Sequence, residues 1–129
     1  MICLLKMSGR LFNLTFDYMK ITQGDIFLAD LNPVRGHEQA GFRPVLILQN
    51  DILNENLSTV VIAPITKNLH AKGLMTTFFL DKKVSKLNHD SIVLLFQVRT
   101  LDKVRLTERI SIIPAPIFME AKRQLQQVF

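Results

Sequence analysis

The sequence has a single cysteine, no tryptophan and no long apolar run. A disulfide within the chain needs two cysteines, so Cys3 cannot form one, and zinc sites built from several cysteines are excluded too. No segment approaches the roughly 18 consecutive apolar residues of a membrane-spanning helix. These absences suit a protein of a reducing cytoplasm, which is the location we expect.

Motifs of nucleotide-dependent and triad enzymes are also missing. The phosphate-binding loop G-x-x-x-x-G-K-[ST], the nucleophile elbow G-x-S-x-G and the dinucleotide fingerprint do not occur. The three histidines, His37, His70 and His89, lie far apart and form no i, i+4 pair. We therefore expect neither a metal nor a cofactor, and chemistry carried by loop side chains alone.

What is present fits one globular domain with a basic surface. The chain has 129 residues, of which 48% are apolar and 21% charged, enough for a single core. A net charge of +5 favours polyanionic partners, either nucleic acid or acidic proteins. Residues 1–19 lack the apolar core and cleavage site of a secretory signal. We interpret them as a translated upstream extension outside the core, and residues 20–129 as the domain.

The pattern predicts many short strands and one C-terminal helix. Pro116 suits a first helical position, and the residues after it place apolar side chains on one face. Pro64 argues for an edge position or a bulge in its strand. The expected fold is mainly β, a strongly bent sheet or small barrel with a C-terminal helix. Expected strands cover residues 26–31, 45–48, 59–66, 74–80, 91–95 and 110–113, and expected helical turns cover 51–56 and 102–108.

The chain is organised around residues 24–50, which read as strand, polar loop and strand. Asn32-Pro33 and Gly36 interrupt the strand pattern. The loop places Arg35, His37, Glu38, Gln39 and Arg43 at one end of a sheet, where rigid scaffolds often hold functional groups.

Four blocks of this sequence resemble the MazF/PemK family of toxin endoribonucleases. They are GDIFLADLNP (24–33), GHEQAGFRPVLILQN (36–50), APIT (63–66) and QVRTLD (97–102). The resemblance covers residues 21–129. It implies an SH3-like barrel that forms a homodimer, cleaves single-stranded RNA without a metal ion, and is neutralised by a cognate antitoxin. The implied products carry 2′,3′-cyclic phosphate and 5′-hydroxyl ends.

The resemblance implies Arg43, Thr66 and His37 as catalytic residues. It also implies RNA contacts by Glu38, Gln39, Phe42, Lys67, Gln97 and Arg99. Such a site suits RNA, whose own 2′-hydroxyl can attack the adjacent phosphorus, because the enzyme need only align groups, move protons and stabilise phosphoryl charge. From the residues alone, Arg43 could equally be a surface arginine paired with Glu38 or Asp51. Thr66 could be an ordinary strand-end residue, and His37 a solvated one.

Individual roles stay open at this stage. Arg43 suits transition-state stabilisation better than base catalysis, because its pKa is too high for a base. The base is either His37 or a carboxylate such as that of Glu38. The PemK/Kid branch has a catalytic arginine and aspartate where this chain has Leu94 and Phe96, so that second pair is missing. We expect Phe96 in the core, with stacking on a base as the alternative.

Two further function classes compete with RNA cleavage. One is a non-enzymatic toxin of the same fold that binds a protein such as gyrase. The absence of tryptophan from the C-terminal segment argues against it. The other is a degenerate member that binds RNA without cutting it, which Leu94 and Phe96 keep open.

Overall fold

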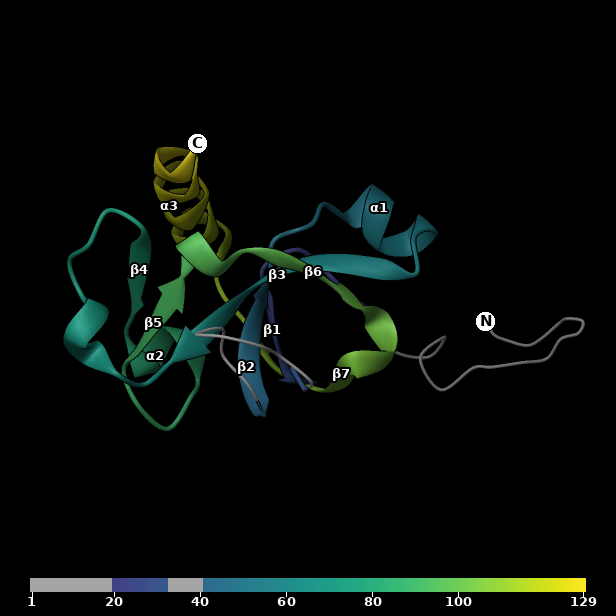
Figure 1. Cartoon of the computed structure of the whole chain (residues 1–129), viewed down its shortest axis with the longest axis horizontal. Helices are drawn as coiled ribbons and strands as arrows, with labels where there is room; N and C mark the ends of the chain where they lie inside the picture. Colours follow the sequence, from purple (N-terminus) through teal and green to yellow (C-terminus); the bar gives the residue numbers. More distant parts are fainter. Residues whose placement is uncertain (1–19, 33–40) are drawn as a thin grey trace, which may run out of the picture.

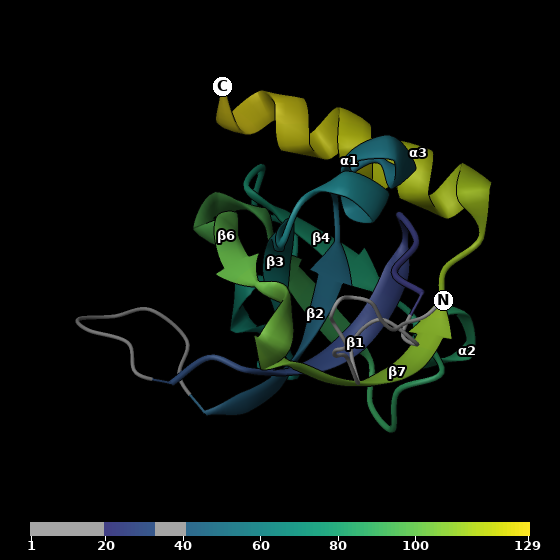
Figure 2. The same ribbon diagram turned by 90° about the vertical axis from the view of Figure 1, so that its right-hand side faces the viewer.

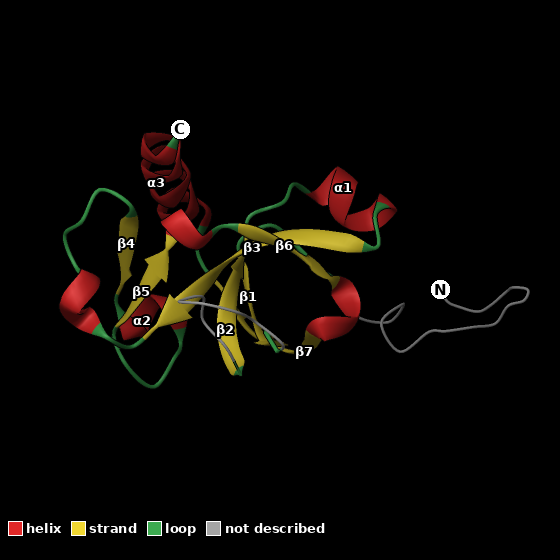
Figure 3. Cartoon of the chain, viewed as in Figure 1, coloured by secondary structure: helices red, strands yellow, loops and turns green. Residues whose placement is uncertain are grey.

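A computed structural model of the chain describes residues 20–32 and 41–129; the expected extension 1–19 lies outside them. Figure 1 shows the short strands with the helices around them, and Figure 3 colours the helices red and the strands yellow. Short 3₁₀ turns lie at η2 (Leu69–Ala71), η3 (Leu95–Gln97), η4 (Lys103–Arg105) and η5 (Gln126–Val128). The main elements are β1 (Asp25–Asp30), β2 (Phe42–Ile47), α1 (Asp51–Asn56), β3 (Thr59–Thr66), β4 (Thr77–Leu80), α2 (Lys82–Ser85), β5 (Ser91–Leu94), β6 (Arg99–Asp102), β7 (Leu106–Ile112) and α3 (Ala115–Leu125).

The strands form one seven-stranded antiparallel sheet in the order β4-β5-β3-β2-β1-β7, with β6 also pairing β3. This confirms the expected mainly β fold with a C-terminal helix. Within the described residues β4 and β7 end the path without pairing each other, so the bent sheet is not a closed barrel. Among the same residues, no helix is long and apolar enough to cross a membrane.

Both faces of the central strands are buried, which explains their apolar runs. Alternate side chains of β1 and β2 enter two different cores: Phe27 and Ile47 lie in one, and Ile26 and Leu46 in the other. The second core also receives Phe118 of α3, which lies across the sheet in Figure 2. A strand covered on both faces reads as a continuous apolar run instead of an alternation.

The expected edge position of Pro64 is wrong for the strand as a whole. β3 is internal, and Pro64 is paired with Val45 of β2. On its other side β3 pairs β6 as far as Ile62 and β5 from Ile65 onwards. Pro64 thus stands where β3 changes partners, and a residue without a backbone N–H is tolerated at such an interruption.

Three further expectations need correction. The expected helical turn at 102–108 contains only η4, because Leu106 already begins β7 and is buried. The expected strand at 74–80 starts only at Thr77, whose hydroxyl donates to the carbonyls of Ala71 (2.7 Å) and Leu74 (3.1 Å) in the preceding turns. Phe96 is not a core residue, because η3 leaves its side chain 49% exposed. Leu94, in contrast, is buried at the end of β5.

Lys103 makes the free energy of unfolding depend on pH. Its side chain is buried, and its Nζ donates to the carbonyl of Asn54 in α1. Burial lowers the pKa of Lys103 below the usual 10.5. Between this lowered pKa and 10.5 the unfolded chain therefore binds more protons than the folded protein, and the free energy of unfolding rises with pH across that interval.

Lys103→Met removes this titration and tests it. We expect the wild type to gain stability relative to the variant as the pH rises from about 7 to about 10. Urea unfolding of both proteins, followed by circular dichroism at each pH, measures the difference. A difference that stays constant across this range contradicts the assignment.

Candidate functional site

A hollow of about 430 Å³ lies where β2 begins and β3 ends, beside the connection that precedes β5. Its lining combines cationic and hydroxyl side chains with an apolar wall. The lining residues are Phe42, Arg43, Pro44, Ile65, Thr66, Lys67, Leu87, Asn88, His89 and Ser91.

Strand register brings Arg43 and Thr66 to this hollow. The antiparallel pairs of β2 and β3 end at Val45 opposite Pro64. The same register extended by two residues sets Arg43 opposite Thr66. Residues directly opposite each other on neighbouring antiparallel strands have their side chains on the same face of the sheet, so this register sets the two side chains on one side. Both line the hollow.

The hydroxyl of Thr66 is oriented by the backbone. Thr66 is 9% exposed at the end of β3, and its Oγ1 accepts a hydrogen bond from the Asn68 backbone N at 3.1 Å. A threonine hydroxyl can accept and donate at the same time. Its own proton can therefore be donated to a ligand in the hollow.

Phe42 and Lys67, both predicted to bind RNA, also line this hollow. Phe42 is 62% exposed, so its ring offers a face to a ligand. Lys67 follows Thr66 directly and is exposed. The hollow thus has two cations, Arg43 and Lys67, a buried hydroxyl and an exposed ring. This combination suits an anionic ligand with flat groups, such as a nucleotide chain.

Two predicted RNA contacts lie elsewhere. Gln97 and Arg99 line neither this hollow nor the smaller one described below. Arg99 donates from Nη2 to the Leu31 carbonyl at 3.5 Å, at the end of β1. Within the part of the chain that the structure describes, the Gln97 Oε1 is buried and has no hydrogen-bond partner.

His37, Glu38 and Gln39 lie outside the described residues; the described residues on either side of that segment, Asn32 and Gly41, are joined by hydrogen bonds. The backbone N of Gly41 donates to the Asn32 side chain at 3.0 Å, and its carbonyl accepts from the Leu31 N at 2.9 Å. Gly41 has φ +79°, which favours glycine. Arg105 adds a bond from Nη1 to the Asp30 carbonyl at 3.2 Å. We call this set the Asn32–Gly41 clamp. It joins the end of β1 to Gly41, two residues before Arg43.

No motif or spacing in the sequence indicated that residues 87–91 belong to the site. Leu87, Asn88, His89 and Ser91 reach the hollow because β5 pairs the end of β3, with Thr66 opposite Ile92. Among the described residues, His89 is the histidine that lines this hollow. Across residues 20–32 and 41–129, no group of three or more histidine, cysteine or acidic side chains is arranged to bind a metal ion.

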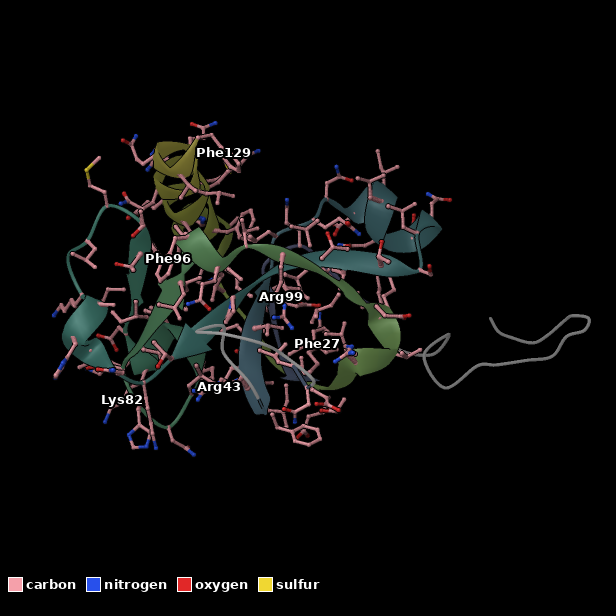
Figure 4. The ribbon with its side chains drawn as sticks, in the orientation of Figure 1. Phe27, Arg43, Lys82, Phe96, Arg99 and Phe129 are labelled. Atoms are coloured by element: carbon pink, nitrogen blue, oxygen red, sulfur yellow. The ribbon has the colours of Figure 1, made fainter. Side chains whose placement is uncertain are left out.

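Figure 4 gives the wider arrangement of labelled side chains. Arg43 and Lys82 lie toward the same end of the molecule in this view, whereas Phe96 and Phe129 lie beside α3. Phe96 lines neither hollow, so its expected alternative, stacking on a base, has no support from these cavities.

Comparisons with known proteins agree with the resemblance found in the sequence. Residues 22–129 match the family described as PemK-like, MazF-like toxin of type II toxin–antitoxin system. The endoribonuclease MazF of Staphylococcus epidermidis is 44% identical over 105 residues, which cover 81% of this chain and 88% of that protein.

Solved structures are similar over most of the chain. The structure of MazF from Deinococcus radiodurans has a TM-score of 0.72 and 26% identity, covering 85% of this chain and 96% of that one. A structure of MazE–MazF from the same organism has a TM-score of 0.67 and 26% identity, with the same coverage.

Proposed function

The chain belongs to the PemK-like, MazF-like toxins of type II toxin–antitoxin systems, and we propose that it cuts RNA in the hollow between β2 and β3. It is an endoribonuclease of that family. Its partners are RNA, a cognate antitoxin and a second copy of the chain. The substrate we assign is single-stranded RNA in the cytoplasm, cut selectively by sequence and without a metal ion. The observation that supports this site is that Arg43 and Thr66, from two adjacent strands, line one hollow.

The reaction follows from the chemistry of RNA. The 2′-hydroxyl of one nucleotide attacks the phosphorus of the next linkage while the bond from phosphorus to the 5′ oxygen breaks. The attacking oxygen loses its proton to a base, and the leaving 5′ oxygen gains one. The products are a 2′,3′-cyclic phosphate and a 5′-hydroxyl, so this step consumes no water.

Arg43 and Thr66 stabilise the charge that builds up during this step. The planar guanidinium of Arg43 donates two parallel hydrogen bonds to non-bridging phosphoryl oxygens and stays cationic throughout. The Thr66 hydroxyl, oriented by the Asn68 N–H, donates a third bond. Donors fixed in place before the reaction stabilise the transition state more than the substrate. We assign the base to His37 or Glu38, in the sequence between Asn32 and Gly41.

The remaining residues bind RNA. Phe42 offers a stacking surface and Lys67 a phosphate contact at the hollow, and Glu38 and Gln39 belong to the adjoining segment. Gln97 and Arg99 are proposed to contact RNA beyond the hollow, near the end of β1. The net charge of +5 also suits an acidic antitoxin segment.

The function is tested by incubating the purified protein with a long RNA in the presence of EDTA. Primer extension should map discrete cuts, and the upstream fragments should carry 2′,3′-cyclic phosphate ends. Intact RNA that is nevertheless retained in a gel-shift assay would instead mean a binding protein without activity. Trapped gyrase with intact RNA would mean a protein-directed toxin.

Thr66→Val removes the hydroxyl and keeps the volume of the side chain. We expect kcat to fall by about 10²-fold, the usual effect of losing one donor to a developing oxyanion. Thr66→Ser is the matched control and should stay within about tenfold of the wild type, because it keeps the donor. Single-turnover cleavage measures both variants, and equal losses in the two would rule out the hydroxyl as the important group.

A further inference from the structure

A second, more polar hollow of about 330 Å³ adjoins the first. It is lined by Lys67, Leu69, Lys82, Asn88, His89 and Asp90. Lys67, Asn88 and His89 line both hollows, so the two share one wall. A chain that occupies the first hollow can therefore continue into the second.

The charge of the second hollow is positive. Lys67 and Lys82 are exposed cations, and Asp90 is the one carboxylate among the lining side chains. That carboxylate is already engaged, because its Oδ1 accepts from the Lys82 backbone N at 2.9 Å. The surrounding residues 67–90 contain five lysines and two aspartates. The other aspartate, Asp81, caps α2 through the Lys83 backbone N at 2.8 Å.

Local structure holds these groups in place. Lys67 directly follows β3, and Asn88–Asp90 directly precede β5, which is paired to the end of β3. Lys82 is the first residue of α2. The connection after α2 is fixed through buried Ser85, whose Oγ accepts from the Leu87 N at 3.1 Å and whose carbonyl accepts from the Ser111 hydroxyl of β7. The hollow is thus supported by paired strands and a capped helix.

We propose that this second hollow binds the RNA phosphate next to the scissile one, which rests on the proposed function. A phosphate held by Arg43 in the first hollow leaves the adjoining linkage to pass the shared wall of Lys67 and His89 and reach Lys82. Lysine ammonium groups act on phosphate as point charges and read no base. The subsite therefore adds affinity uniformly across RNA sequences, while base selection belongs to other residues.

Lys82→Gln tests the subsite, because Lys82 lines only the second hollow. We expect KM to rise about three- to tenfold for every cleavable sequence, with kcat within about twofold, as for one lost phosphate contact. The slope of log Kd against log salt concentration should decrease by about 0.7, the value for one phosphate contact on a single strand. Lys83→Gln is the matched control: it removes the same charge from the next residue of α2, which lines neither hollow, and should change none of these values.

A modified substrate ties the effect to one phosphate. Two RNAs carry a neutral methylphosphonate either one linkage 5′ or one linkage 3′ of the cut. One of them should raise KM for the wild type by the same factor as Lys82→Gln. Because the contact is then already lost, Lys82→Gln should add less than about twofold on that RNA.

The outcomes separate this proposal from the proposed function. A wild type that cuts no RNA overturns the function itself. A wild type that cuts RNA, with Lys82→Gln equal to Lys83→Gln and neither neutral linkage affecting KM, overturns the subsite alone. Unchanged RNA kinetics together with weaker inhibition by an acidic antitoxin peptide also overturns it, and assigns the hollow to the antitoxin.

Discussion

Arg43→Ala is expected to lower kcat for RNA cleavage by about 10³-fold, the upper range for the loss of one oxyanion donor. The side chain lies at the start of β2 in the hollow that also contains Thr66. Among the described residues that line this hollow, the lysine cation Lys67 is a point charge and does not supply the same planar pair of donors. Quenched-flow cleavage of a short RNA with one cut site measures the loss.

Arg43→Lys is the matched variant, because it keeps the charge and removes the fork. We expect it to recover about tenfold over the alanine variant and to stay well below the wild type. Because Arg43 is only half-buried, both variants should unfold at nearly the wild-type urea concentration. A kcat for Arg43→Ala within tenfold of the wild type would remove Arg43 from the reaction.

Phe27→Ala is expected to lower the free energy of unfolding by about 3–5 kcal/mol. Phe27 is fully buried on β1 and packs in the core with Leu31, Val45 and Ile62. Its removal leaves a cavity bordered by strands that are paired on both sides and cannot close over it. Such a loss is a large part of the roughly 5–15 kcal/mol that stabilises a domain. Urea unfolding followed by circular dichroism measures it.

Phe42→Ala is the matched control for this prediction. It makes the same chemical change on the paired strand, at a ring that is 62% exposed. We expect its free energy of unfolding within about 0.5 kcal/mol of the wild type, and weaker RNA binding. If both variants lost the same stability, the core assigned to Phe27 would be wrong.

Sequence patterns predicted the elements whose side chains have a regular environment. The hairpin of β1 and β2 and the helix α3 were predicted from apolar runs, turn residues and helical periodicity. Pro64 and Phe96 were placed wrongly, because their positions depend on where β3 changes partners and where η3 turns the chain outward. These are tertiary features, and local propensity does not encode them.

The candidate site was predictable only in part. Arg43, Phe42 and Thr66 belong to blocks of sequence that resemble a known family, Lys67 directly follows one of these blocks, and the structure brings all four to one hollow. His89 and Lys82 lie in a charged connection without any spacing signal. His89 reaches the hollow of Thr66 because β5 pairs the end of β3, and Lys82 lines the adjoining hollow. A long-range strand pairing of this kind cannot be inferred from the composition of the connection.

The Asn32–Gly41 clamp has a consequence for diversification. In the described part of the chain, the clamp joins the facing ends of β1 and β2 through bonds made by Asn32, Gly41 and Arg105. Lengthening a surface segment between fixed ends costs little free energy, about 0.6 kcal/mol for each doubling. This scaffold can therefore lengthen or exchange the intervening positions other than the base, by grafting or by drift, and acquire new cleavage sequences while β2 and β3 stay as they are.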